Sequence, residues 1–353
     1  MKRLPLLLLA FVFLGAGCFD LGGSKQNKND GGVFRTTDSG GVWTQAVALP
    51  GAKGVGTIAS VDIIAMEHDP IDSEALYLGT RAHGMFFSLD NAVTWQQPRH
   101  AELREGAVYD IEVDPKNLCT VYAAKARRLY KSSTCGRTWE TDRYVETREN
   151  VMITDIVADW FNPNVVWIGL SNGDLLKSED GARKWARVLQ TKNGITSVLV
   201  SNKDSRIIVV GTNRSGFYRS TDGGKNWAQT EKELKDWRSA DTIYSLAQDG
   251  KSKMLVAATK YGLLRSYDIG ATWEPMPMLT SAGQVEVKAV AVDAADANHV
   301  YYATGSTFYT TTDAGKNWAT KKLPTTRNPE RMVMDPKNAS GVFVGVASNE
   351  KKD

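Results

Sequence analysis

The feature that most constrains the fold is an eight-residue motif, Ser/Thr-x-Asp-x-Gly-x-x-Trp, which recurs along the chain. Two copies, STDGGKNW and TTDAGKNW, are nearly identical, and relaxed matches raise the number to seven. Successive motif tryptophans are 42 to 52 residues apart, a period typical of one four-stranded β-propeller blade. The copies, called octets below, occupy residues 36–43, 88–95, 132–139, 178–185, 220–227, 266–273 and 311–318.

The octet has the composition of a self-contained turn. Its Ser/Thr and Asp side chains can bond nearby backbone N–H groups, its Gly adopts backbone angles that other residues resist, and its Trp can fill the gap below. The motif resembles the Asp-box of Asp-box propellers. We therefore interpret the octet aspartates as turn-forming residues and the octet tryptophans as core, and we assign neither to a ligand.

The ends of the chain predict how the ring closes. Alternating β-rich runs around each octet predict four strands a blade, such as the inner strand VYDIEV at 108–113. After the last octet the chain supplies an inner and a second strand, at 330–336 and 341–348, whereas only a third strand precedes the first octet. We predict an all-β, seven-bladed propeller over 32–349 with a closing blade shared by the two termini, which removes free edges, and a short tail at 350–353.

The N-terminal sequence MKRLPLLLLAFVFLGAGC resembles a bacterial lipoprotein signal, with a basic start, an apolar run and small residues before Cys18. In such signals the cysteine becomes the lipid-modified first residue of the mature chain. Because Leu14 stands one position farther from the cysteine than in the usual pattern, cleavage without lipid attachment is the alternative. We expect a signal peptide at 1–17, lipidation at Cys18, a flexible tether at 18–31, and an exported, lipid-anchored protein on the extracytoplasmic side of a membrane, either periplasmic or at the cell surface.

The composition is that of an ordinary globular protein, with 42% hydrophobic and 24% charged residues and a formal net charge of +3. Removal of Lys2 and Arg3 with the signal would lower the charge from +3 to +1. That balance does not fit a nucleic-acid binder, which should carry a strongly basic domain.

Two further cysteines, Cys119 and Cys135, are expected at adjacent ends of neighbouring strands in one blade. The octet that contains Cys135 is also the one in which Thr134 replaces the aspartate. An exported protein meets an oxidising compartment, so we predict a disulfide between them; the alternative is two unrelated small buried residues.

Sequence signatures of common catalytic chemistry are not found. The four histidines lack metal-site spacing, the glycine-rich segment GAKGVGT at 51–57 lacks a Gly-Lys-Ser/Thr ending, and there is no Gly-x-Ser-x-Gly elbow. We predict no cofactor, no metal and no catalytic residue, and an enzyme is the less favoured reading.

One acidic feature lies in the predicted channel. Asp62, Asp110 and Asp155 are predicted to share one inner-strand position in three successive blades. We weigh a channel cation site or acid pair against carboxylates that brace neighbouring blades, and we favour bracing. Later blades are predicted to place Ser197, Ser245, Ala289 and Arg331 at that position.

A basic rim is the main candidate for partner binding. Blade connections alternate between two faces: the octets share one, the octet face, with the turns that follow the inner strands. The other, the loop face, carries both chain ends, the second-to-third-strand loops and the blade-to-blade loops, and loops of this kind commonly carry function. A cationic rim suits an acidic partner, although a merely solvated loop set is the alternative. Trp160 and Trp167 are interpreted as core. The predicted partner-binding residues are Arg81, Lys125, Arg127, Arg128, Arg214, Lys260, Trp237 and Arg238.

These features together resemble the photosystem II assembly and stability factors of the thylakoid lumen, which are seven-bladed Asp-box propellers with an arginine-rich patch and, in cyanobacteria, a lipid anchor. The blade sequence also resembles sortilin-type and xyloglucanase-type propellers. The first resemblance implies a non-catalytic, monomeric scaffold for a membrane or envelope protein. The second leaves a carbohydrate-active protein, a glycosidase or a sugar binder, as the rival, which would depend on a carboxylate such as Asp62 or Asp155. The octet itself serves many functions.

Overall fold

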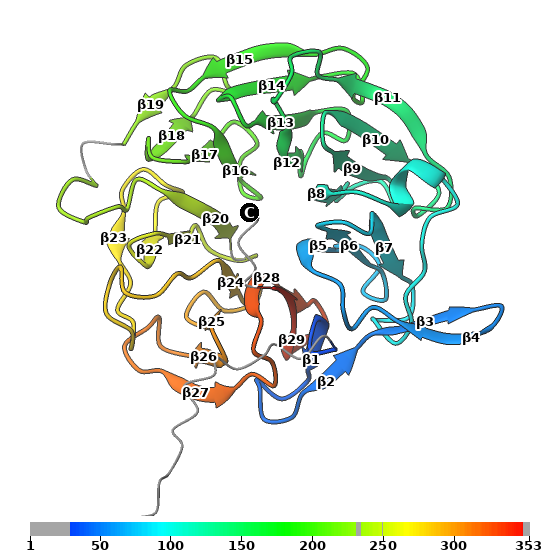
Figure 1. Cartoon of the computed structure of the whole chain (residues 1–353). Coiled ribbons are helices and arrows are strands. Elements are labelled where there is room, and N and C mark those ends of the chain that lie inside the picture. The colour runs from blue at the N-terminus through cyan, green and yellow to red at the C-terminus, as the bar shows by residue number, and fades with distance from the viewer. Residues whose placement is uncertain (1–28, 231–233, 249, 349–353) are drawn as a thin grey trace, which may run out of the picture.

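The computed structural model of the chain shows seven blades arranged in a ring around a central channel (Figure 1). It describes residues 29–230, 234–248 and 250–348. The predicted signal peptide, Cys18 and most of the tether lie outside these residues. Within the described part of the chain, no helix is long and apolar enough to cross a membrane.

Blades 2 to 6 are each a four-stranded antiparallel sheet, built from the channel outward in chain order. Blade 2 comprises β8 (Val108–Val113), β9 (Val121–Lys125), β10 (Arg128–Ser132) and β11 (Glu140–Val145). Blade 3 comprises β12 (Ile153–Ala158), β13 (Val166–Leu170), β14 (Asp174–Ser178) and β15 (Ala186–Gln190). Blade 4 comprises β16 (Ile195–Val200), β17 (Ile208–Thr212), β18 (Phe217–Ser220) and β19 (Ala228–Gln229). Blade 5 comprises β20 (Ile243–Gln248), β21 (Leu255–Thr259), β22 (Leu263–Ser266) and β23 (Glu274–Pro275), and blade 6 comprises β24 (Ala289–Val292), β25 (Val300–Thr304), β26 (Thr307–Thr311) and β27 (Ala319–Lys322).

Blade 1 departs slightly from this plan. It consists of β5 (Ile63–His68), β6 (Leu76–Thr80) and β7 (Met85–Ser88), and an isolated bridge between Phe87 and Gln96 marks its outermost position. A short 3₁₀ helix, η1 (Ala101–Arg104), follows on the way to blade 2.

The closing blade is shared by the two ends of the chain, as predicted. From the channel outward it contains β28 (Asn328–Asp335), β29 (Asn338–Ala347), β1 (Gly32–Thr36) and β2 (Thr44–Ala46). The antiparallel register pairs Gly32 with Val346 and Thr36 with Val342. The seven-bladed, all-β prediction is therefore confirmed.

A hairpin inserted after the closing blade lengthens the first interval between octets. Strands β3 (Ala48–Gly51) and β4 (Gly54–Thr57) pair with each other and project from the rim of the ring (Figure 1). The glycine-rich segment at 51–57 belongs to this hairpin, so its glycines serve a turn.

Each octet turn is fixed by the same hydrogen bonds. In STDGGKNW, the Ser220 hydroxyl donates to Asp222 Oδ1 at 2.9 Å and accepts from the Gly224 N–H at 2.9 Å, while Asp222 Oδ1 accepts from the Asn226 N–H at 2.9 Å. The fourth octet residue, Gly223 here, has φ of 75° and donates its N–H to the Arg206 carbonyl in the turn after the inner strand, at 3.0 Å. All seven octets make this last bond.

The octet tryptophans pack unequally. Trp95 and Trp273 are buried, and Trp95 donates its indole N–H to the Ala46 carbonyl of the preceding blade at 2.9 Å. The other five are half-buried at the edges of clusters between blades. The octet tryptophans thus seal the outer seams between blades.

Candidate functional site

The loop face is assembled by hydrogen bonds between the predicted loop types. The N–H of Arg81 donates to the Asp62 carbonyl at 3.0 Å, and the N–H of Lys260 donates to the Thr242 carbonyl at 2.9 Å. Each bond joins a second-to-third-strand loop to the segment that leads into an inner strand. Arg81 and Lys260 therefore lie on the same face of the ring.

Three of these cations are already partnered. Arg81 Nη1 lies 3.4 Å from Asp62 Oδ2, Arg128 forms an ion pair with Asp142, and Lys125 donates to the main-chain carbonyl of Glu102. The charges of Arg81 and Arg128 are thus partly neutralised by carboxylates, and Lys125 is held by a carbonyl group.

Four other cations on the loop face are exposed: Arg127, Arg214, Arg238 and Lys260. Among the residues that the structure describes, none of the four forms an ion pair. Arg214 is presented from a strained position with φ of 74°, a conformation that is uncommon for residues other than glycine. These four side chains can take an external anion without breaking an internal pair.

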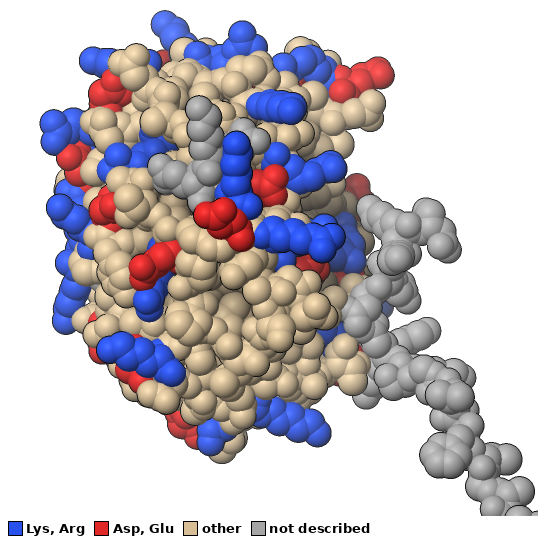
Figure 2. Space-filling view, turned by 90° about the vertical axis from the view of Figure 1, so that its left-hand side faces the viewer, with Lys and Arg blue, Asp and Glu red and all other residues tan. Residues whose placement is uncertain are grey.

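Basic residues are not confined to the loop face, contrary to expectation. The edge view in Figure 2 shows Lys and Arg side chains over much of the outer wall and at both of its edges. Octets contribute part of this charge, and there it sits beside octet aspartates, as Lys184 does beside Asp180. Among the described residues, Lys225, Lys253 and Lys316 on the octet face are also exposed and form no ion pair. The lack of ion pairs therefore does not by itself distinguish the loop face.

Trp237 is less available than predicted. It is half-buried against the blade 5 core, with its ring centroid 6.5 Å from that of Tyr261. Its neighbour Arg238 is exposed. Trp237 therefore supports the base of this part of the loop face.

Asp62 does not occupy the channel position that was predicted for it. The register pairs Ala65 with Gly79, just as Asp110 pairs with Ala124, so Ala65 is the blade 1 counterpart. Asp62 instead closes the ring: it accepts from Arg327 Nη1 at 2.8 Å and from the Ser348 N–H and hydroxyl, each at 2.7 Å. The predicted three-carboxylate level is wrong.

Asp110 and Asp155 do share a level, and both brace neighbouring blades. Asp110 Oδ2 accepts from the Ile156 N–H at 2.7 Å, and Asp155 Oδ2 accepts from the Val198 N–H at 2.6 Å. Each bond runs from one inner strand to the next. Within the described residues, no group of three or more His, Cys, Asp or Glu side chains is placed to hold a metal ion.

The channel contains a cavity of about 400 Å³ lined by inner strands. Two of its carboxylates, Glu67 and Glu112, were missed in the sequence. They stand two positions beyond Ala65 and Asp110 on the inner strands, and that spacing, which returns a strand side chain to the same face, could have revealed them. Glu112 Oε1 accepts from the Ala158 N–H at 2.9 Å.

Enclosure in the channel favours the neutral form of these acids. Burial and the nearby carboxylates raise the pKa of Glu67 to about 8, and burial raises the pKa of Asp110 to about 7. The same causes raise the pKa of Glu112 and Asp155 well above the ordinary range. Desolvation disfavours a charged carboxylate.

The two tryptophans interpreted as core differ. Trp167 is buried, with 1% of its surface exposed, as expected. Trp160 is 37% exposed and lines the channel cavity near the octet face, so its interpretation as core was wrong. The sequence signal was its place after Asp159, where blades 1 and 2 have Pro70 and Pro115.

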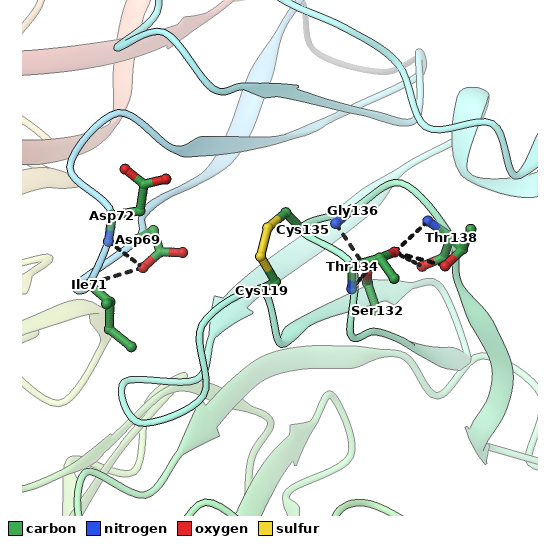
Figure 3. Close-up of a disulfide and its surroundings, with 9 residues drawn as sticks. All are labelled: Asp69, Ile71, Asp72, Cys119, Ser132, Thr134, Cys135, Gly136 and Thr138. Atoms are coloured by element: carbon green, nitrogen blue, oxygen red, sulfur yellow. Dashed lines mark hydrogen bonds between the residues drawn. A yellow bond between two sulfur atoms is a disulfide. The ribbon is translucent and has the colours of Figure 1, made fainter.

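Cys119 and Cys135 are joined by a disulfide (Figure 3). It spans the contact that every octet makes with the turn after the inner strand, here the 3.1 Å bond from the Cys135 N–H to the Cys119 carbonyl. In the same octet Thr134 Oγ1 takes over the role of the missing aspartate and accepts from the Thr138 N–H at 2.9 Å.

The ring of four-stranded blades and the seven repeated turns define the chain as an Asp-box β-propeller. More particularly, it belongs to the family described as photosynthesis system II assembly factor YCF48, whose model matches residues 88–255 and 189–351. No curated protein matches the sequence significantly.

Solved structures resemble the chain at the level of the fold. YCF48 from Cyanidioschyzon merolae aligns with a TM-score of 0.60 at 15% identity, covering 82% of this chain and 97% of that one. A structure described as YCF48 bound to D1 peptide aligns with a TM-score of 0.62 at 12% identity, covering 81% and 93%. The GH74 xyloglucanase from Xanthomonas campestris aligns with a TM-score of 0.66 at 18% identity, covering 81% of this chain but only 51% of the enzyme. The chain thus spans about half the length of that xyloglucanase.

Proposed function

We propose that the protein is a non-catalytic binding propeller that helps to assemble or stabilise a membrane or envelope protein through its loop face. The observation that carries the proposal is the set of exposed, unpaired cations on that face. An exposed charge without an internal partner can be used for steering and for complementary contact with an acidic surface. Family membership supports the assembly role, and the relative that was solved with a D1 peptide supports a protein partner.

The carbohydrate-active alternative has weaker support. It rests on the likeness of this chain to about half of a GH74 xyloglucanase. The carboxylates named for it, Asp62 and Asp155, are held by Ser348, Arg327 and the Val198 backbone. A glycosidase would need its acids free to meet a substrate.

We also propose that Cys18 carries a lipid and that the propeller works at the extracytoplasmic surface of a membrane. The signal-like N-terminal sequence supports this proposal. Both chain ends enter the ring on the loop face, where Asp30 accepts from the Thr326 hydroxyl at 2.7 Å. An anchor at Cys18 would hold the unpaired cations near the membrane. Radiolabelled palmitate should label the wild-type chain but not Cys18→Ala; equal labelling would refute the anchor.

The partner proposal is tested by matched charge reversals. Capture is followed with a photo-crosslinker at Lys192, an exposed loop-face residue that is not one of the four unpaired cations. The triple variant Arg127→Glu/Arg214→Glu/Lys260→Glu should lose the crosslinked membrane or envelope protein. The control Lys225→Glu/Lys253→Glu/Lys316→Glu makes the same change in net charge on exposed octet-face lysines and should retain it.

The expected loss of affinity is about 10- to 100-fold for three reversed rim charges. Arg128→Gln is a second control, because this arginine lies next to Arg127 but is already paired with Asp142. Equal capture by the triple variant and the wild type would refute the loop-face proposal.

A further inference from the structure

Exposed apolar side chains gather on the face opposite the cationic rim. Among the described residues, eleven large hydrophobic side chains are exposed, and seven of them lie in octets or in the turns after inner strands, on the octet face. Four of the seven lie in the turns after the inner strands of three successive blades, and we call them the mouth cluster: Ile71 (48% exposed), Leu118 (57%), Trp160 (37%) and Phe161 (53%).

The mouth cluster comes from three successive blades. Its residues follow β5, β8 and β12, which neighbour one another around the channel (Figure 1). Figure 3 shows the first two of these turns, one with Ile71 and one with Cys119, the residue after Leu118. The position that matches Ile71 and Phe161 holds Lys116 in blade 2, Lys203 in blade 4 and Lys337 in the closing blade. In blade 2 the apolar residue is therefore Leu118, two positions after the lysine.

These apolar side chains are held outward by rigid turns. Asp69 Oδ1 accepts from the N–H groups of Ile71 and Asp72 at 2.8 and 3.0 Å. Asp159 Oδ1 bonds the Phe161 N–H at 2.8 Å in the same way. Preorganised apolar groups lose little entropy on binding, and exposed patches of this kind commonly mark interaction surfaces.

The cavity reaches the turns that carry the mouth cluster. Pro70, Pro115 and Trp160 line the cavity at its octet-face end, where the inner strands end. Glu67 and Glu112 lie on those strands, farther from the octet face. Its volume of about 400 Å³ can accept a long side chain. Apolar wall residues, including Val157 and Leu199, face the same space.

The acidic side chains of the cavity outnumber the basic ones, and a cation placed beside them would favour their charged form. Four carboxylates line it, Glu67, Asp110, Glu112 and Asp155, against two cations, Lys288 and Arg331. Lys288 Nζ is bound to Glu330 at 3.0 Å, and Arg331 donates to the Glu330 carbonyl at 3.0 Å. Among the described residues, none donates a hydrogen bond to Glu67, unlike Asp110, Glu112 and Asp155. The Glu67 carboxyl group can therefore accept a hydrogen bond from a ligand.

We propose that the channel mouth on the octet face is a second docking site, which takes an apolar segment of a protein partner and receives one of its Lys or Arg side chains beside Glu67 and Glu112. The aliphatic stem of that side chain would lie along Trp160 while its charged head reaches the carboxylates, a division that long cationic side chains commonly adopt. Apolar neighbours in the segment would cover Ile71, Leu118 and Phe161. This site is independent of the unpaired cations on the loop face.

A random-peptide phage library is the probe for this proposal. It is selected on the immobilised full chain and depleted on the variant Ile71→Ser/Phe161→Ser, whose two changes are on exposed side chains and should leave the fold intact. We expect enrichment of peptides with one Lys or Arg flanked by apolar residues. No enrichment after depletion, or enrichment of peptides without a basic residue, would overturn the proposal.

Affinity measurements on one enriched peptide then separate the two sites. Glu67→Gln/Glu112→Gln should weaken binding at least tenfold, as should replacement of the peptide's basic residue by norleucine. The loop-face variant Arg127→Glu/Arg214→Glu/Lys260→Glu should bind like the wild type. Undiminished binding by the Gln variant, or binding of a xyloglucan oligosaccharide that competes with the peptide, would overturn the assignment while leaving the loop-face proposal untouched.

Discussion

Removal of the Cys119–Cys135 disulfide should destabilise the propeller substantially. The bond closes a segment with a sequence separation of 16 residues. The loop-closure entropy lost from the unfolded chain on closing a loop of this size corresponds to about 3 kcal/mol at 25 °C. The free energy of unfolding of Cys119→Ser/Cys135→Ser should therefore be lower than that of the wild type by about 3 kcal/mol.

The surrounding octet indicates that this loss will not disrupt the turn. Its hydroxyl network persists through Ser132, Thr134 and Thr138, so the variant should still fold. Restoring the aspartate with Thr134→Asp in the variant should recover about 1 kcal/mol, because a charged acceptor makes a stronger hydrogen bond than a hydroxyl.

The assay is equilibrium unfolding in urea, followed by tryptophan fluorescence, with and without dithiothreitol. Reductant should lower the midpoint of the wild type and leave that of the double Ser variant unchanged. If dithiothreitol lowers the free energy of unfolding of the wild type by less than about 1 kcal/mol, the entropy argument is contradicted. An equal effect of reductant on the variant would show that the effect does not come from this bond.

Three further predictions follow from other contacts. Asp62→Ala should lower the free energy of unfolding by about 2–4 kcal/mol, because it leaves the buried Arg327 with fewer partners; a loss below about 1 kcal/mol in urea would contradict the ring-closing role. The pKa of Glu67 is raised to about 8 in the folded state. Glu67 therefore does not destabilise the fold below its ordinary pKa, and its destabilisation of the fold grows as pH rises toward 8. Urea unfolding at pH 5 and pH 8.5 should show Glu67→Gln gaining about 1–3 kcal/mol over the wild type, whereas parallel pH profiles would refute this. Trp95→Ala should cost about 3–5 kcal/mol and the half-buried Trp185→Ala clearly less; equal thermal shifts would count against the packing argument.

The architecture was predictable because it repeats. Each octet carries its own hydrogen-bonding groups, so seven local signals give the blade count, and two unmatched half-blades give the closure. Cys119 and Cys135 were also within reach, since both are tied to the octet geometry that places the two turns together.

The channel was less predictable because strand register is not a local property. Each inner strand from β5 to β20 carries an irregularity near its start, as between Ile63 and Ala65, which changes the face on which later side chains emerge. The alternation of side chains around Asp62 is compatible with either strand register. Only the pairing of Ala65 with Gly79 decides between the two registers. The exposure of Trp160 likewise depends on where the ring leaves its cavity open, which no single blade determines.

The shared closing blade also affects the order in which the chain folds and the way the ring responds to tension. Strand β1 is synthesised before the other described strands, yet its partner on β29 lies about 300 residues later and must be paired across the whole ring. The strands β1 and β2 therefore cannot take their final place until β29 has been synthesised. A pull on residue 29 would load the contacts of Asp30 with Thr326 and Arg327 and then the ladder between β1 and β29. Tension at this end of the ring would therefore act directly on the closing blade.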